Sequence, residues 1–215
     1  MNHLIYVGDP MCSWCYGFGP ELAALLKAIP NVKLDFVMGG LRAGGKDSVT
    51  PEFRDFIHGH WKQVQQASGL PFNFAAIEHP GFVYDTEPIC RAFVTARMLY
   101  PELPSMAQLA LFAALQQAFY SKGQDVTQGE VLAQVSCQAL TRLNHPTKED
   151  EFLAFWQGQP AKTQTNAHFE QAAHWGITGF PSLLVVQNEQ LFLLSSGYAK
   201  TPVLLAHFKK IQAQV

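Results

Sequence analysis

The first third of the chain shows two different spacings of apolar residues. A short apolar run over residues 3–7 ends at a turn-forming stretch, residues 8–10, and predicts a buried strand. A helix is expected next, as far as about Lys27, because Pro30 removes a backbone donor and disfavours helix in the residue before it. Over residues 32–36 apolar and charged residues alternate, which predicts a second strand.

A long helical pattern follows, from Thr50 to about residue 159. Thr50 before Pro51 is a good N-cap with proline at the first helical position, and Gly69 is expected to end that helix. Thr127 and Glu130 have the spacing of a capping box, which predicts the start of another helix. The remaining helices of this block are expected over residues 86–100, 105–121 and 147–157.

Strands return near the C-terminus. Residues 182–187 and 191–195 are apolar runs separated by the turn signal Asn188-Glu189, which predicts a hairpin. Thr201-Pro202 is expected to cap a last helix, whose apolar face consists of Leu204, Leu205, Phe208 and Ile211. The order of elements predicts an α/β protein with a mixed four-stranded sheet interrupted by an all-helical insertion.

Composition and charge limit the classes of partner. The 215 residues are 48% hydrophobic, enough for one large domain or two closely packed ones. A formal charge of −2, from 15 basic and 17 acidic residues, gives no electrostatic reason to expect nucleic acid or an anionic membrane. The apolar runs are far shorter than the roughly 20 residues of a membrane span. We therefore expect a soluble globular protein.

The N-terminus has no room for a signal peptide, which takes about 15–30 residues, because the first strand begins by His3. Four cysteines are too few for a disulfide-stapled secreted scaffold. If Met1 is the native start, a cytoplasmic protein is expected, and in a reducing compartment a close pair of cysteines is more plausibly catalytic than structural.

Cys12 and Cys15 are separated by Ser13 and Trp14, where the first strand gives way to the first helix. A Cys-X-X-Cys pair at such a junction is typical of a thioredoxin-like redox site. Unpaired N–H groups and the positive end of the helix dipole stabilise a thiolate there, and can lower the pKa of a thiol from about 8.5 to roughly 3.5–7.5. Half of a zinc site and a structural pair are the alternatives.

Four stretches carry a resemblance to a known family. They are the opening Cys12–Gly17, Pro20 in the first helix, the loop Gly176–Pro181 before an apolar strand, and Ala118–Val126 in the helical block. With the order of elements, they resemble the DsbA-like branch of the thioredoxin superfamily. The nearest resemblance is to its signal-less cytosolic group, which comprises FrnE-like proteins and predicted protein-disulfide isomerases.

The resemblance implies a thioredoxin-like domain made of residues 1–48 and 160–215, with an inserted helical domain of residues 49–159. It also implies a thiol–disulfide oxidoreductase, a reductase or isomerase of protein, peptide or small-molecule disulfides. No bound cofactor and no metal are expected. Glutathione or a thioredoxin-type reductant is expected as redox partner, and the oligomeric state is not indicated.

The same resemblance, together with the positions next to the thiols, suggests roles for six residues. Cys12, at the exposed end of the helix, is expected to attack a substrate disulfide, and Cys15, one turn further in, to keep a higher pKa and resolve the mixed disulfide. Pro181 is expected to follow a cis peptide bond that turns the backbone of Phe180 towards the thiols, as an edge for a substrate peptide. Trp14 is expected in an apolar rim for substrates, with plain packing as the alternative. Tyr16 shares that expectation.

One position departs from the periplasmic members of the family. They carry a histidine between the cysteines, which helps to make their disulfide strongly oxidising. Ser13 and Trp14 carry no charge. We therefore expect a milder, more reducing site.

Other candidate residues have simpler interpretations. Asp9 either relays protons or ends the turn, and the turn is favoured. Cys90 and Cys137 are expected to be buried small hydrophobes, although Cys90 could face the thiol pair. His58 and His60 lack fitting partners for a metal.

Two rival functions stay open. Kappa-class glutathione transferases and 2-hydroxychromene-2-carboxylate isomerases share the architecture and use glutathione, but a serine commonly replaces their cysteine pair. A structural zinc site joining the pair to Cys90 or Cys137 is the non-catalytic alternative, although the chain has no second Cys-X-X-Cys.

Overall fold

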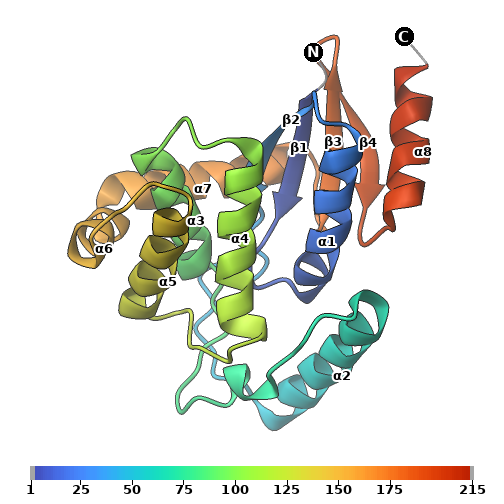
Figure 1. Cartoon of the computed structure of the whole chain (residues 1–215). Helices are drawn as coiled ribbons and strands as arrows, with labels where there is room; N and C mark the ends of the chain where they lie inside the picture. Colours follow the sequence, from blue (N-terminus) through green and yellow to red (C-terminus); the bar gives the residue numbers. More distant parts are fainter. Residues whose placement is uncertain (1–2, 214–215) are drawn as a thin grey trace.

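The sheet of this protein carries helices on both faces, and a further group of helices extends from one side of it (Figure 1). The computed structural model describes residues 3–213. In chain order the elements are β1 (His3–Gly8), α1 (Ser13–Ala28), β2 (Lys33–Met38), α2 (Pro51–Ser68), the short 3-10 helix η1 (Phe74–Ile77), α3 (Glu87–Leu99), α4 (Ser105–Tyr120), α5 (Gly129–Arg142), α6 (Glu149–Gln157), α7 (Gln159–His174), β3 (Ser182–Gln187), β4 (Gln190–Ser196) and α8 (Thr201–Gln212). Within residues 3–213, no helix is both long enough and apolar enough to span a bilayer.

The four strands form one mixed sheet in the order β2-β1-β3-β4. Strand β1 is parallel to β2 and antiparallel to β3, and β3 is antiparallel to β4. Asn188 and Glu189 both have left-handed backbone conformations, with φ of 49° and 64°, as a tight hairpin turn requires. The predicted mixed four-stranded sheet and its C-terminal hairpin are confirmed.

The two faces of β1 belong to different apolar clusters. Leu4 and Tyr6 lie in the main core, which also contains buried residues of α1, α4 and α8. Ile5 and Val7 alternate with them and pack with Ala172 of α7 on the opposite face. The sheet is therefore covered on both sides. Helices α3 to α6 lie beside it, and α2 lies below the start of α1 in the view of Figure 1.

The ends of α2 follow the predicted capping pattern. The hydroxyl oxygen of Thr50 accepts a hydrogen bond from the N–H of Phe53 at 3.2 Å, and Pro51 is the first helical residue. Gly69 ends the helix with φ of 73°, a left-handed conformation that glycine adopts without a steric penalty. This helix forms one wall of the site described below.

Two other predicted caps are wrong, and a nearby carboxylate explains each case. The carboxylate of Asp125 accepts hydrogen bonds from the N–H (3.0 Å) and the hydroxyl (2.6 Å) of Thr127, so the predicted capping box does not form. The carboxylate of Glu21 accepts from the N–H (2.7 Å) and the hydroxyl (2.6 Å) of Thr201, and Lys200 takes the cap position of α8.

Helix α7 was not predicted, because the expected helical pattern ended near residue 159. The buried residues of α7 are only Ala161, Thr165 and Ala172, so its apolar face is too small to produce a clear helical period. The helix packs against β2 and α3. It covers one face of the sheet, and the proposed domain boundary between residues 159 and 160 stays a prediction.

Candidate active site

The first thiol lies where two distant parts of the chain meet. Cys12 is the N-cap of α1, in an extended conformation, and its thiol donates to the carbonyl oxygen of Phe180 at 3.5 Å. The peptide bond between Phe180 and Pro181 is cis, as expected. The fold therefore places the thiol at the positive end of the helix dipole, next to the loop that precedes β3.

Cys12 is less exposed than expected. Only 6% of the residue is accessible to solvent, so the expectation that it lies at an exposed helix end is wrong. The cause is the close approach of the loop at Phe180, whose side chain lines the same cavity as Cys12. That approach depends on Gly39, because a Cβ at Gly39 would clash with the Phe180 ring.

The second thiol, that of Cys15, lies in the interior of the protein. Cys15 is fully buried, and burial raises its pKa well above that of an ordinary thiol; a hydrogen bond and the charge of Cys12 raise it further. The hydroxyl of Tyr6 hydrogen-bonds to Cys15 and lowers this pKa in part. The Tyr6 ring folds back over Gly8, where a Cβ would lie 2.6 Å from it. Cys15 is therefore the more deeply buried of the two thiols and has a raised pKa, as expected.

Asp9 ties the turn before the thiols to a second loop. Its carboxylate, which is fully buried, accepts from the N–H of Met11 at 2.8 Å and from the N–H of Leu41 at 2.7 Å. Burial raises the pKa of Asp9, and these hydrogen bonds lower it in part. Cys90, also fully buried, lies against this carboxylate, and burial raises its pKa. The contacts of Asp9 match the favoured interpretation, that it organises the turn.

Two tyrosines from the helical part of the chain fix the residue before Cys12. The hydroxyls of Tyr84 and Tyr120 both donate to the carbonyl oxygen of Met11, at 2.7 and 2.5 Å. Both are buried, and burial raises the pKa of each. Sequence reasoning did not assign either tyrosine to the site. The only signal for Tyr120 was the stretch Ala118–Val126, which contains it.

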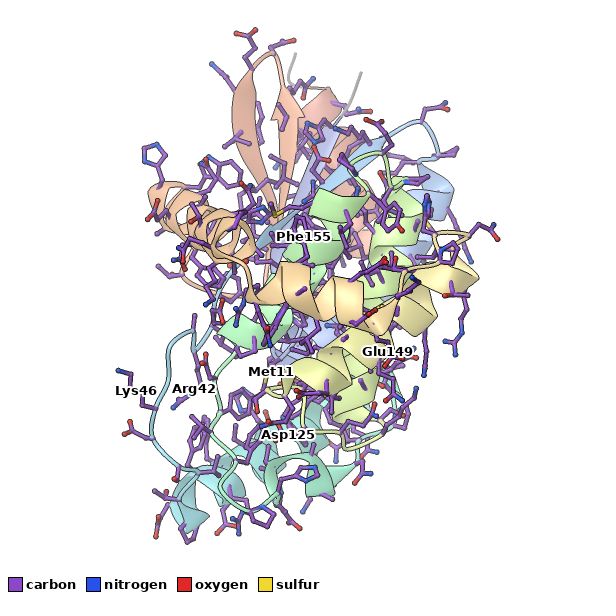
Figure 2. The ribbon with its side chains drawn as sticks, turned by 90° about the vertical axis from the view of Figure 1, so that its left-hand side faces the viewer. Met11, Arg42, Lys46, Asp125, Glu149 and Phe155 are labelled. Atoms are coloured by element: carbon purple, nitrogen blue, oxygen red, sulfur yellow. The ribbon has the colours of Figure 1, made fainter. Side chains whose placement is uncertain are left out.

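A largely apolar cavity of about 400 Å³ opens beside Cys12. Its walls come from the start of α1, the loop after β2, α2 and the loop before β3. Leu41 and Phe56 are 44% and 62% exposed, unusually high fractions for large apolar side chains. Figure 2 shows Met11 in the interior of the molecule and Arg42 on a loop at its edge. The lining residues are Met11, Cys12, Ser13, Trp14, Leu41, Arg42, Phe53, Phe56, Ile57, His60, Trp61, Tyr84 and Phe180.

The two aromatic residues next to the thiols differ in position. Trp14 is half-buried and lines the cavity, and its ring centroid lies 5.5 Å from that of Tyr198. Tyr16 is buried, stacks on Tyr120 at 4.9 Å, and donates its hydroxyl to the carbonyl of Pro71. Of the two interpretations of Tyr16, plain packing therefore holds, because its ring packs into the core.

The remaining candidates lie apart from this arrangement. Cys137, in α5, is buried, and burial with the charges of Glu149 and Asp150 raises its pKa to about 11. His60 lines the cavity, whereas His58 packs edge-on against Phe74. In the described part of the chain, no three His, Cys, Asp or Glu residues are grouped so that they could hold a metal ion.

The mixed sheet, the thiol pair at the start of α1 and the adjacent cis-proline loop define a protein of the thioredoxin class. Residues 4–206 match the family described as "DSBA-like thioredoxin domain". The chain belongs to this family, and its DsbA-like fold is as predicted.

Solved structures show the same architecture over the whole chain. A "putative protein disulfide isomerase" from Nitrosomonas europaea is 34% identical with a TM-score of 0.85, and the match covers 99% of this chain and 98% of that one. The cytosolic disulfide reductase DsbM from Pseudomonas aeruginosa, in a structure with GSH, is 22% identical with a TM-score of 0.74 and coverages of 99% and 100%. A 2-hydroxychromene-2-carboxylate isomerase is 12% identical with a TM-score of 0.66 and coverages of 99% and 97%.

The matches to DsbM and to the isomerase, at 22% and 12% identity, show a shared fold only. No protein with a curated description matches the chain significantly.

Proposed function

We propose that this protein is a thiol–disulfide oxidoreductase that reduces or isomerises protein and peptide disulfides, with Cys12 as the nucleophile and Cys15 as the resolving thiol. The observation that carries the proposal is the position of the Cys12 thiol. It lies 3.5 Å from the carbonyl of Phe180, beside the cis-proline loop, and Cys12 lines an apolar cavity. Its family and its likeness to the Nitrosomonas europaea protein support the same class of reaction.

The reaction needs no bound cofactor. The Cys12 thiolate attacks one sulfur of a substrate disulfide, which forms a mixed disulfide and releases the other sulfur as a thiolate. The Cys15 thiolate then attacks the Cys12 sulfur, so that the Cys12–Cys15 disulfide forms and the second substrate sulfur leaves reduced. If a substrate thiol attacks the mixed disulfide instead, the substrate disulfide is rearranged and the enzyme returns to its dithiol form.

The environments of the two thiols support this division of roles. Burial raises the pKa of Cys15 and disfavours its thiolate, whereas Cys12 lies at the start of α1 and lines the cavity, where a substrate disulfide can reach it. When Cys12 becomes bound to a substrate sulfur, its negative charge is gone. One cause of the raised pKa of Cys15 is then removed, and the Tyr6 hydroxyl remains to stabilise the thiolate.

We assign substrate binding to Trp14, Phe180 and Pro181. Trp14 and Phe180 line the cavity, and Gly179 and Thr178 are exposed next to Phe180. An extended peptide could therefore pair with the backbone before Pro181 while one of its apolar side chains enters the cavity.

The partners follow from the same chemistry. We propose that glutathione or a thioredoxin-type protein returns the enzyme to its dithiol form, and that the reaction takes place in the cytoplasm. Support comes from the likeness to DsbM, a cytosolic disulfide reductase whose structure was determined with GSH. The neutral residues Ser13 and Trp14 favour a more reducing pair than that of the periplasmic enzymes.

The glutathione-dependent isomerase and transferase activities are the alternative. They share the fold with this chain, and one such isomerase is similar over its length. The intact pair of Cys12 and Cys15 favours disulfide exchange instead. A protein of the alternative class would bind glutathione stably and act on small aromatic substrates without needing Cys15.

The proposal is tested by reduction of insulin, followed as turbidity, with wild type, Cys12→Ser and Cys137→Ala. Cys12→Ser is expected to abolish enzyme-dependent turbidity, because no other thiol lines the cavity. Cys137→Ala, a change at a buried thiol outside the cavity, is the matched control and should retain activity. Full activity of Cys12→Ser would end the proposal.

A further inference from the structure

One wall of the cavity carries a positive charge that the reaction described above does not use. Arg42 lies on the loop between β2 and α2, and Figure 2 shows it on the same loop as Lys46. Its guanidinium carbon lies 4.5 Å from the ring centroid of Phe53 and 5.9 Å from that of Tyr84. Both rings line the cavity, so the charge is held against its aromatic wall.

The charge of Arg42 is not balanced inside the cavity. Among the lining residues it is the only Lys, Arg, Asp or Glu side chain, and the described part of the chain offers it no carboxylate within salt-bridge distance. A guanidinium stacked on an aromatic face keeps its in-plane N–H donors free. Those donors match the geometry of a carboxylate, which they can bind through two parallel hydrogen bonds.

The loop that carries Arg42 is fixed by hydrogen bonds. The N–H of Leu41 donates to Asp9 at 2.7 Å, and the N–H of Arg42 donates to the hydroxyl of Thr86 at 3.2 Å. The N–H of Gly44 donates to the carboxylate of Asp85 at 2.8 Å. The backbone is therefore positioned before substrate binds, which lowers the entropy lost when the guanidinium engages an anion.

We propose that Arg42 is a specificity residue, and that the cavity selects peptide disulfides carrying an apolar side chain next to the half-cystine and a carboxylate close by. Cys12 and Arg42 line the same cavity of about 400 Å³. A sphere of that volume is roughly 9 Å across, about the length of three extended residues. The carboxylate is therefore expected within three residues of the half-cystine. This selectivity rests on the proposed function, since the cavity would contact the residues on either side of the disulfide that Cys12 attacks.

The test uses three peptides that differ in one residue. Each carries Phe next to a cysteine blocked as a 2-pyridyl disulfide, and Glu, Gln or Lys two residues from that cysteine. Release of the neutral 2-thiopyridone reports the attack of Cys12 on the cysteine sulfur. With reduced enzyme in excess, the second-order rate constant of this single turnover, which corresponds to kcat/KM, is measured at low and high salt. We expect the order Glu, Gln, Lys, with about a 2- to 5-fold preference for Glu over Gln at low salt that shrinks at high salt.

Variants of the loop assign the preference to one residue. Arg42→Gln is expected to remove the preference for Glu, and Arg42→Lys to keep only part of it, because lysine lacks the planar stacking group. Lys46→Gln is the matched control, since Lys46 is an exposed cation of the same loop that does not line the cavity. It should leave the order of the three peptides intact.

The outcomes separate this proposal from the proposed function. Release with equal kcat/KM for Glu and Gln peptides, or a preference that survives Arg42→Gln, would overturn the selectivity while the function stands. No enzyme-dependent release from any peptide would overturn both.

Glutathione disulfide, which carries carboxylates but no apolar side chain, is the comparison substrate. The proposal for peptides is wrong if two results are found together. The first is that Arg42→Gln lowers the rate of reduction of glutathione disulfide as much as it lowers that of the Glu peptide. The second is that replacing Phe by Ser in the Glu peptide leaves its rate unchanged, in which case Arg42 binds a small disulfide.

Discussion

The floor and the outer wall of the active-site cavity are built in opposite ways. The floor is a buried group of residues around the thiols, Tyr6, Asp9, Met11 and Cys15, of which only Met11 lines the cavity. This group is held by hydrogen bonds of its side chains and backbone. The outer wall, defined by Leu41, Arg42, Phe53 and Phe56, contains exposed apolar side chains and one cation. Cys12 lies between them.

Under the proposed function, the difference indicates that the two regions serve different steps of the reaction. Thiol–disulfide exchange needs sulfur atoms in fixed positions, and buried hydrogen bonds to Met11 and Cys15 provide that rigidity. Recognition of varied peptides needs accessible apolar area, which Leu41 and Phe56 provide at the cost of exposing it to water. Changes in the floor should therefore alter chemical steps, whereas changes in the outer wall should alter binding.

The largest effect in this comparison is expected from Tyr6→Phe. The variant removes the hydroxyl that lowers the pKa of Cys15, so a smaller fraction of Cys15 is ionised at any given pH. A hydrogen bond to a charged group contributes about 1.5 kcal/mol or more, so resolution of the mixed disulfide should slow about tenfold or more. Rapid quenching of a Cys12 mixed disulfide, followed by mass spectrometry, measures that rate directly.

The pH profile distinguishes this effect from a general disturbance of the fold. Because the pKa of Cys15 is raised, the rate of resolution should increase as the pH rises above neutrality in wild type. In Tyr6→Phe the increase should begin at higher pH. A rate lowered equally at every pH would mean that Tyr6 only supports the packing.

A smaller effect is expected on the outer wall, from Phe56→Ser. Phe56 is 62% exposed, so the free energy of unfolding should change by no more than about 0.5 kcal/mol. KM for a peptide disulfide with an adjacent Phe should rise by about 3- to 10-fold, because the substrate loses part of its apolar contact. The rate of resolution should not change.

Leu193→Ser on β4 is the control for Phe56→Ser. Leu193 is 54% exposed but does not line the cavity, so KM should stay at the wild-type value. A slower resolution step in Phe56→Ser, or an unchanged KM, would remove the distinction between floor and outer wall.

The floor and the outer wall also differ in what the sequence could predict. The thiol pair, the turn at Asp9 and the cis-proline loop each have a local pattern of residues, and all three were expected. Tyr84 has none, and for Tyr120 the stretch Ala118–Val126 indicated the family but not the contact. Their hydroxyls reach Met11 from positions 73 and 109 residues away. Only the packing of the helical part against the start of α1 brings them there.

The burial of Cys12 and the existence of α7 were missed for related reasons. Cys12 is covered by Phe180, which is 168 residues away and approaches only because Gly39 leaves room. Helix α7 is stabilised by contacts with β2 and α3, while its own sequence buries only three small side chains. In both cases a tertiary contact outweighs the local pattern.

The central claim is that Cys12 receives the substrate sulfur and Cys15 removes it, and a trapped intermediate tests this most directly. Reduced Cys15→Ser should be mixed with a peptide disulfide, and the adduct located by intact mass and peptide mapping. We expect a stable mixed disulfide on Cys12 that does not resolve, and none in a variant that also carries Cys12→Ser. An adduct on Cys90 or Cys137, or release of the Cys12-bound peptide by Cys15→Ser at the wild-type rate, would contradict the claim.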